Sequence, residues 1–142
     1  MTDDKRRTEV VMAVVRRHGR ICVARRSQDV ATSRGLWSVV TGYLEPGVEP
    51  TTQVWQELDE ELGLNAPTVR LAHRLAPLPL TSPASRKQFL VHPFLFEAEE
   101  QCEPVLNWEH TDLAWVLPDR LKDADCVAWQ QPIVLALLAI RE

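Results

Sequence analysis

Residues 42–64 read GYLEPGVEPTTQVWQELDEELGL, and this stretch decides the fold. Its first part is rich in glycine and proline, which is typical of a loop. Pro50 suits the first position of a helix, and Gly63 suits the position just past a helix end. The apolar residues between them recur at helical spacing, so we predict a helix that buries one face. These residues are Val54, Trp55, Leu58 and Leu62.

The same helix carries a stripe of carboxylates. Residues 48–64 include five acidic side chains and no Lys or Arg. At about 100° per residue, Glu60 and Glu61 project about 60° and 40° to either side of Glu57. Carboxylates at these spacings repel each other by roughly 0.2–0.5 kcal/mol per pair. A hard divalent cation such as Mg²⁺ would turn that penalty into affinity, because it prefers oxygen ligands. The alternative interpretation is an ordinary solvated acidic face.

Strand-like segments lie on both sides of this helix. The predicted strands span residues 9–15, 20–25, 36–41, 68–75, 88–97 and 113–116. Gly19 supplies the positive φ angle for a hairpin between the first two strands. Pro93 argues for an edge position or a bulge in its strand, since proline cannot donate to a ladder. A proline-rich connection is expected over residues 77–83, and a mostly apolar helix over residues 132–140 closes the chain.

The order of strands, helix, strands and helix predicts an α+β fold in which helices sandwich a mixed β-sheet. The 142 residues are the size of one domain, so we assign residues 1–142 to a single domain. The net charge of −4, with no long basic run, argues against nucleic acid as a partner.

No apolar run approaches a membrane span, and the polar start of the chain does not read as a signal peptide. The three cysteines, Cys22, Cys102 and Cys126, are far apart in sequence, which is typical of free thiols in a reducing compartment. We therefore expect a soluble, cytoplasmic protein.

Residues 42–48 and 56–64 together resemble the Nudix box. In that family the pattern is G, five residues, E, seven residues and then R-E-U-x-E-E-x-G-U, where U is a bulky aliphatic residue. The spacing here matches without insertion. Residues 21–26 and 35–37 look like the strand and loop before the box, and Glu109 lies six residues before Trp115, as an acidic residue does in several members. The chain is identified by this resemblance as a member with the Nudix fold.

Two positions of the box depart from the pattern. Val48 stands at the first glutamate, with Glu49 one place later, and Gln56 stands at the arginine. In the family that glutamate and that arginine help to fix the loop against the helix. Losing both partners leaves no stranded charge, so we expect the fold to survive the double change. Its effect on turnover is left open by the sequence.

The resemblance also implies roles for individual residues. Glu57, Glu60 and Glu61 would hold Mg²⁺, or Mn²⁺ as the alternative, with the carbonyl of Gly42 as a further ligand and substrate contact. Glu57, Glu60 and Glu109 would be the catalytic carboxylates, with Glu57 or Glu109 accepting a proton from the attacking water and His110 as a competing base.

Other side chains are candidates for substrate contacts. Arg25 would contact a phosphate, unless it makes a surface ion pair. Arg86 and Lys87 precede a strand from which they could reach an anion. Trp37 and Trp115 are expected to pack in the core rather than to stack on a base.

The implied function is a metal-dependent hydrolase that cleaves the diphosphate linkage of a nucleoside diphosphate joined to another group. The alternative, motivated by Val48 and Gln56, is a nucleotide-binding or sensor domain with impaired chemistry. An isoprenyl diphosphate isomerase would share the fold, but no cysteine lies near the box for that chemistry. A small-molecule diphosphate is the expected partner, and the resemblance also allows a homodimer.

Overall fold

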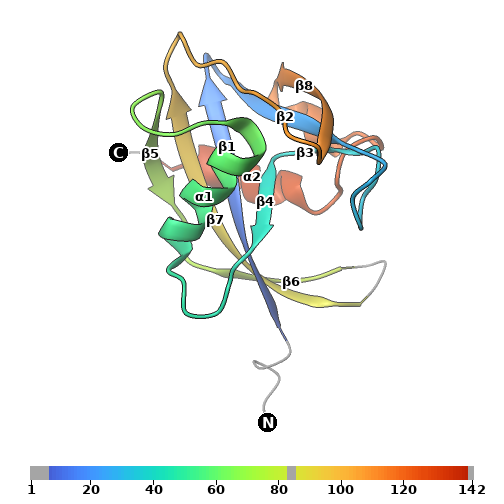
Figure 1. Ribbon diagram of the computed structural model, residues 1–142. Coiled ribbons are helices and arrows are strands. Elements are labelled where there is room, and N and C mark those ends of the chain that lie inside the picture. The colour runs from blue at the N-terminus through green and yellow to red at the C-terminus, as the bar shows by residue number, and fades with distance from the viewer. Residues whose placement is uncertain (1–6, 83–85, 141–142) are drawn as a thin grey trace.

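In the computed structural model, which describes residues 7–82 and 86–140, one mixed sheet lies between two helices (Figure 1). The strands are β1 (Thr8–Arg17), β2 (Arg20–Arg26), β3 (Trp37–Ser38), β4 (Val40–Tyr43), β5 (Val69–Arg74), β6 (Leu78–Thr81), β7 (Gln88–Ala98) and β8 (His110–Val116). The helices are α1 (Pro50–Leu62), the short 3-10 helix η2 (Pro118–Lys122) and α2 (Gln130–Leu138). The predicted α+β sandwich is therefore confirmed.

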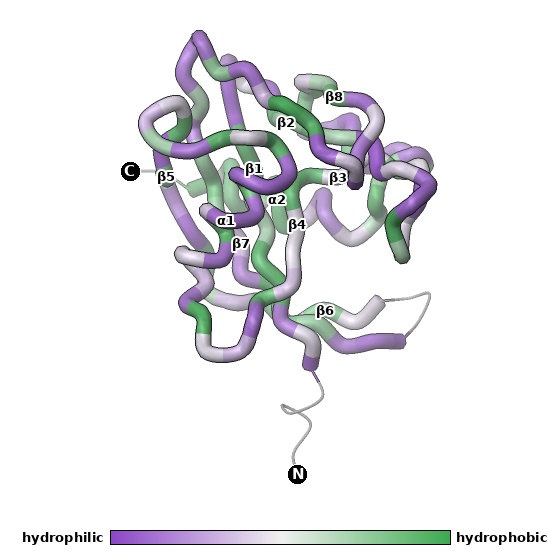
Figure 2. Tube along the Cα trace, in the orientation of Figure 1, coloured by the Kyte–Doolittle hydropathy of each residue, from purple (hydrophilic) through white to green (hydrophobic). Residues whose placement is uncertain are grey.

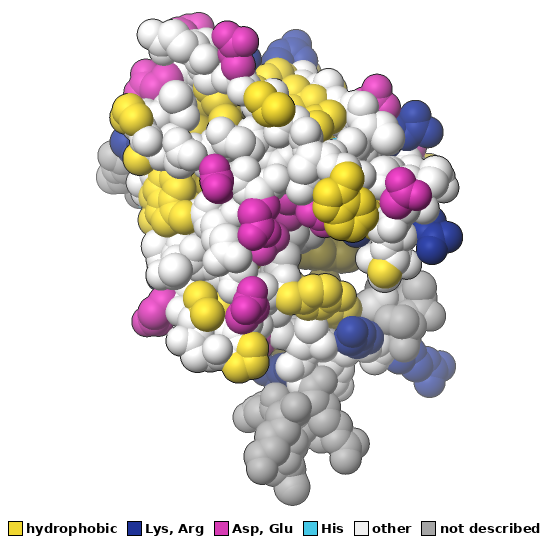
Figure 3. All heavy atoms as spheres, in the orientation of Figure 1, with side chains coloured by type: hydrophobic (Ala, Val, Ile, Leu, Met, Phe, Trp, Pro, Cys, Tyr) yellow, Lys and Arg dark blue, Asp and Glu magenta, His cyan; other side chains and the backbone are white. Residues whose placement is uncertain are grey.

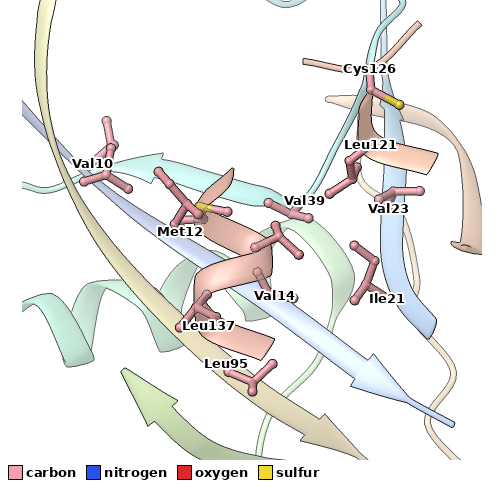
Figure 4. Packing of buried hydrophobic residues seen from close by; sticks show 13 residues of the cluster. Val10, Met12, Val14, Ile21, Val23, Val39, Leu95, Leu121, Cys126 and Leu137 are labelled. Carbon is pink, nitrogen blue, oxygen red and sulfur yellow. The ribbon is translucent and has the colours of Figure 1, made fainter. Parts of the chain in front are cut away.

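Strand β1 builds both hydrophobic cores, because successive side chains of a strand point to opposite faces. Val11, Ala13 and Val15 pack in one cluster with Val54, Leu58 and Leu62 of α1. Val10, Met12 and Val14 pack in the other with Ile133, Val134 and Leu137 of α2. Figure 4 shows Met12, Val14 and Leu137 together in this second cluster. The two helices consequently cover opposite faces of the sheet.

Helix α1 has the boundaries that its terminal residues predict. It begins at Pro50, and Gly63 adopts a left-handed φ of 64° just past its end. The amide of Gly63 donates to the carbonyl of Asp59, and that of Leu64 donates to Leu58, which closes the last turn. Figure 2 shows the helix alternating between hydrophilic and hydrophobic segments. Trp55 lies at the border of the buried face. Its ring packs edge-on against that of Phe96, with the two ring centroids 4.9 Å apart.

The prediction that Pro93 marks an edge position or a bulge is wrong. Strand β7 is an interior strand that pairs in parallel with β1 and antiparallel with β5 and β6. Pro93 lies opposite Met12, and its carbonyl accepts a hydrogen bond from the amide of Leu75. The nitrogen and carbonyl of one strand residue face the same side, so the missing N–H of Pro93 points to the junction between β6 and β5. The sheet tolerates proline there because neither partner strand continues across that junction.

Two other segments differ from their predictions. The single strand expected over residues 36–41 is divided into β3, which pairs with β2, and β4, which pairs with β1. The chain changes partner at Val39, whose amide donates to Oε1 of Gln130 in α2. The proline-rich connection contains a strand, β6, in which Pro79 lies opposite Leu90. β6 pairs with β7 alone among the described strands, so Pro79 needs no second ladder partner. Pro83 lies outside the described residues.

The remaining boundaries shift by a few residues. Helix α2 begins and ends two residues earlier than predicted, and β8 begins at His110 rather than at residue 113. Gly19 has the expected positive φ of 75°, and His18 shares it with a φ of 52°. In the described ranges, neither helix combines the length and apolarity needed to span a bilayer.

Candidate functional site

Glu57 on α1 lies directly against Gly42 on β4. A Cβ atom built on Gly42 would lie 2.2 Å from both Cδ and Oε1 of Glu57. A side chain at this position would displace the carboxylate, so the glycine of the box allows Glu57 to approach the backbone of β4. One turn further along α1, Glu61 is buried, with 2% of its side chain exposed, and its carboxyl group interacts with that of Glu57.

Burial and mutual repulsion perturb this carboxylate pair. The pKa of Glu61 is raised well above its ordinary value, first by burial and then by the charge of Glu109 and the contact with Glu57. The pKa of Glu57 is also raised, chiefly by burial, with smaller contributions from the charges of Glu60 and Glu109. The charges of Glu57, Glu61 and Glu109 therefore act on one another.

Glu109 lies in the loop directly before β8, and its charge acts on Glu57 and Glu61. Its carboxylate Oε1 accepts a hydrogen bond from Nδ2 of Asn107, and its amide donates to Oδ1 of Asn107. Its carbonyl accepts a hydrogen bond from the amide of Ser27 at the end of β2. These bonds fix the loop that carries Glu109 against the neighbouring strand. Figure 3 shows acidic side chains gathered beside a hollow on this face of the molecule.

Glu60 occupies a different environment from Glu57 and Glu61. It is exposed, and its Oε2 accepts a hydrogen bond of 3.0 Å from Nε2 of Gln56. Gln56 is the residue that stands at the arginine of the box, so this departure ties one predicted ligand to a neutral amide. The assignment of Glu60 as both a metal ligand and a catalytic residue stays a prediction.

The charge of Arg26, rather than that of Arg25, acts on the buried Glu61. The positive charge of Arg26 lowers the pKa of Glu61 and of His110, although burial dominates the net shift of each. Arg25 is exposed, and its Nε donates to the carbonyl of Gly35. The ladder between β2 and β8 changes register between Arg25 and Arg26. The proposed phosphate contact of Arg25 stays a prediction, and Arg26 is a candidate that sequence reasoning did not single out.

His110 is buried next to Glu61. Its Nε2 lies 3.8 Å from Oε1 of Glu61, and each side chain is 2% exposed. The pKa of His110 is lowered, first by burial and then by Arg26, so the imidazole is held neutral. Its Nδ1 is buried without a hydrogen-bond partner. A loop position was expected for this residue, but the first position of β8 instead aims it into the site.

Gln53 was not recognised in the sequence, although it contacts both the loop and Glu57. Its side-chain Oε1 accepts a hydrogen bond of 3.1 Å from the amide of Glu45. Its Nε2 donates a hydrogen bond of 3.0 Å to Oε2 of Glu57. Gln53 is 1% exposed. A glutamine within a helix has no sequence signature that would mark this role.

Two exposed aromatic residues adjoin the site in sequence. Tyr43 follows Gly42 and is 60% exposed, whereas Trp108 precedes Glu109 and is 67% exposed. The ammonium of Lys87 lies 5.9 Å from the centroid of the Tyr43 ring. By contrast, Trp37 and Trp115 are partly buried and pack against the hydrophobic clusters, as expected. Solvent-exposed rings beside a polar site are typical of surfaces that stack on a planar ligand.

The donor set at this site fits a hard divalent cation. The carboxylate of Glu57 lies against the backbone of Gly42 and interacts with the carboxyl group of Glu61, and oxygen is the ligand that Mg²⁺ and Mn²⁺ prefer. Within residues 7–82 and 86–140, no group of three or more His, Cys, Asp or Glu side chains is already arranged to hold a metal ion. A cation held by these side chains would therefore reduce the repulsion between Glu57 and Glu61 and would replace the hydrogen bond that Glu60 accepts from Gln56.

A mixed sheet between two helices, with a glycine-backed carboxylate helix on one face, defines the class of domain to which the chain belongs. A family model described as NUDIX domain matches residues 5–137. The chain belongs to this family. The box, its spacing and the resemblance drawn from them are thereby confirmed.

Comparison with known proteins gives similar folds at low sequence identity. The chain is 20% identical to the MutT protein of Methanosarcina mazei Go1, with a TM-score of 0.71 over 92% of this chain and 91% of that one. It is 16% identical to the NUDIX domain of Shewanella oneidensis NrtR, solved as a complex with ADP ribose, with a TM-score of 0.70 over 97% of each chain. At these identities the likeness concerns the fold.

A curated relative shares a shorter segment. The chain is 40% identical over 70 residues to an octanoyltransferase of Myxococcus xanthus, a match that covers 47% of this chain. The match covers about a fifth, 19%, of the length of that relative.

Proposed function

We infer that the chain is a Nudix-type pyrophosphohydrolase that cleaves the phosphoanhydride bond of a nucleoside diphosphate linked to another group. The observation that carries this proposal is the interacting pair of Glu57, which packs against Gly42, and buried Glu61, with the charge of Glu109 acting on both. A protein seldom holds several carboxylates together in a partly buried site unless a cation or a proton transfer uses them.

The proposed chemistry is attack of water on phosphorus. A P–O bond forms to the water oxygen, and the bond to the bridging oxygen breaks. When bound, a divalent cation supplies neutralisation of the diphosphate oxygens and lowers the pKa of its water. Glu57 or Glu109 accepts the proton that the water loses. Arg26 adds a fixed positive charge beside Glu61, where developing negative charge on the phosphates is stabilised.

The substrate class is a nucleotide-like diphosphate. The NUDIX domain of NrtR was solved with ADP ribose, and this compound combines a diphosphate with a base. Trp108 and Tyr43 provide exposed rings that can stack on a base, while the carboxylate pair engages the diphosphate through Mg²⁺ or Mn²⁺. The homodimer and the cytoplasmic location expected from the sequence stay predictions.

A substrate screen tests the proposal. Nucleoside triphosphates, dinucleoside polyphosphates, sugar nucleotides and ADP ribose are incubated with Mg²⁺ or Mn²⁺, and products are identified by ³¹P NMR. Turnover is expected in the wild type and is expected to be lost in Glu57→Gln. Asp59→Asn is the matched control, because Asp59 is an exposed carboxylate on the same helix that is bonded to Asn65. Absence of turnover by the folded wild type on every compound would contradict the proposal.

One observation favours a nucleotide-binding domain with impaired chemistry as the second candidate. Gln56 binds Glu60, and half-buried Val48 offers no charge at the corresponding loop position. Reverting both with Val48→Glu and Gln56→Arg separates the two functions. A large gain in rate would show that the natural site is impaired, whereas an unchanged rate would show that the present carboxylates suffice.

A further inference from the structure

The loop over residues 44–49 needs an anchor on α1, because it leads from Gly42 to the helix that carries Glu57. Val48 is apolar, and Gln56 on α1 is exposed and bonded to Glu60. The side chain of Gln53 supplies the anchor: its Oε1 accepts the hydrogen bond of the Glu45 amide at 3.1 Å. At 1% exposure, this bond is shielded from competing water.

The same amide group orients Glu57. Nε2 of Gln53 donates to Oε2 of Glu57 at 3.0 Å, while Oε1 of Glu57 faces the Cα of Gly42. The two carboxylate oxygens are thus assigned to different neighbours, and rotation of the carboxylate would break one contact. Because the donor is a neutral amide, it holds Glu57 without cancelling the negative charge that attracts a cation. A Lys or Arg in this place would bind Glu57 as a competing cation.

We propose that Gln53 is a positioning residue for the metal-binding carboxylate Glu57, and that it couples the loop over residues 44–49 to that carboxylate. The inference rests on the proposed function, since it concerns the same cation site. The buried amide of Gln53 takes the place of a charged connection between the loop and the helix. Loss of the amide would free the loop and Glu57 together.

The chain contains a matched control for this amide. Gln130 on α2 is also 1% exposed, accepts a hydrogen bond from the Val39 amide and donates one to Oγ of Ser38. Like Gln53, it therefore accepts one bond from a backbone amide and donates one to a side-chain oxygen at the same burial, on a helix that packs against the other hydrophobic cluster. Gln53→Met and Gln130→Met remove equivalent bonds with little change in volume.

The experiment measures Mn²⁺ binding to the full chain by EPR and calorimetry, without substrate. Gln53→Met is expected to weaken Mn²⁺ binding tenfold or more, whereas Gln130→Met should bind within twofold of the wild type even if both lower the melting temperature. Equal Mn²⁺ affinity in Gln53→Met and wild type would overturn this inference and would leave the proposed function standing. An equal weakening in both variants would also overturn it, because the effect would then be general destabilisation.

A second measurement needs no variant and covers the case in which Gln53→Met fails to fold. In ¹⁵N NMR spectra of the wild type, the side-chain amide signals of Gln53 should shift on titration with Mg²⁺, with the affinity found by calorimetry, while those of Gln130 stay fixed. Unmoved Gln53 signals at saturating Mg²⁺ would overturn the inference. If the wild type binds neither cation, the cation site of the proposed function fails and this inference fails with it.

Discussion

Glu57 and Gly42 are in contact so close that a single methyl group cannot be placed between them: a Cβ on Gly42 would lie 2.2 Å from the carboxylate carbon. Gly42 does not have the positive φ that restricts four other glycines of the chain, so alanine is conformationally allowed there. The glycine is required for space alone. This relationship makes the position a direct probe of the carboxylate.

Gly42→Ala is expected to displace the Glu57 carboxylate while the strand stays intact. A displacement of about 1 Å at a catalytic group can cost about 10²-fold in rate. We therefore expect kcat to fall by about two orders of magnitude, measured by ³¹P NMR, with unchanged circular dichroism. Thr41→Ala in the same strand is the control. A wild-type rate in Gly42→Ala would show that Glu57 does not need its observed position.

The metal-free protein should lose stability as the pH rises above the ordinary carboxyl range. In the unfolded chain Glu61 loses its proton near its ordinary pKa of 4.5, but in the folded chain it does so only at a higher pH. Between these two values the unfolded state binds fewer protons, so the free energy of unfolding falls with rising pH. Glu57 adds a contribution of the same sign.

Urea unfolding in EDTA measures how the free energy of unfolding depends on pH. The measurements run from about pH 4 to about pH 8, a range that brackets ordinary and raised carboxyl pKa values. Glu61→Gln should flatten this dependence and should stabilise the protein at the upper end. Added Mg²⁺ should restore stability mainly at high pH, because cation binding displaces the proton. A wild-type profile identical to that of Glu61→Gln would contradict the raised pKa.

Trp108→Ala should weaken the binding of substrates that carry a base. Stacking on an aromatic side chain contributes about 1–3 kcal/mol per base, which corresponds to roughly 5- to 150-fold in KM. Inorganic tripolyphosphate has no base, so its KM should not change. Leu117→Ala is the control, since Leu117 is another exposed apolar side chain, at 54% exposure, outside the site. An equal change in KM for the base-carrying substrate and for tripolyphosphate would exclude stacking.

The three cysteines should react slowly with thiol reagents in the native state. All three are free and buried, and burial is the main cause that raises the pKa of Cys22 to about 12 and of Cys126 to about 11. The thiolate is the reactive form, so little of either reacts at neutral pH. Ellman's reagent should modify all three only after unfolding in urea. Fast native reaction of any thiol would show that its segment opens readily.

The sequence predicts this fold well because its strongest signals are local. Pro50 and Gly63 mark the ends of α1 through their own backbone preferences, and no tertiary information is needed to place them. The division of residues 36–41 into two strands depends instead on Gln130, which lies far along the chain and binds the amide of Val39. Pro93 was misplaced for a similar reason, since the gap between β6 and β5 exists only in the assembled sheet.

The candidate site shows the same division. Helical periodicity is enough to bring Glu57 and Glu61 to one face, and the resemblance adds Gly42 and Glu109. Gln53 and Arg26 could not be selected, because a single polar residue in a helix or strand does not reveal its partner. Their roles come from contacts across elements, of which the bond between Gln53 and the Glu45 amide is the clearest.

The parallel pairing of β1 with β7 has a consequence for folding during synthesis on the ribosome. The two strands pair from Thr8 with Phe89 to Arg16 with Glu97, and the ion pair between Arg16 and Glu97 joins residues 81 positions apart. Such long-range pairings form slowly, because a long segment must close first. β1 is synthesised long before β7. Its edge toward β7 therefore stays unpaired until β7 has left the exit tunnel. Co-translational folding of this domain should therefore be completed only when most of the domain has emerged.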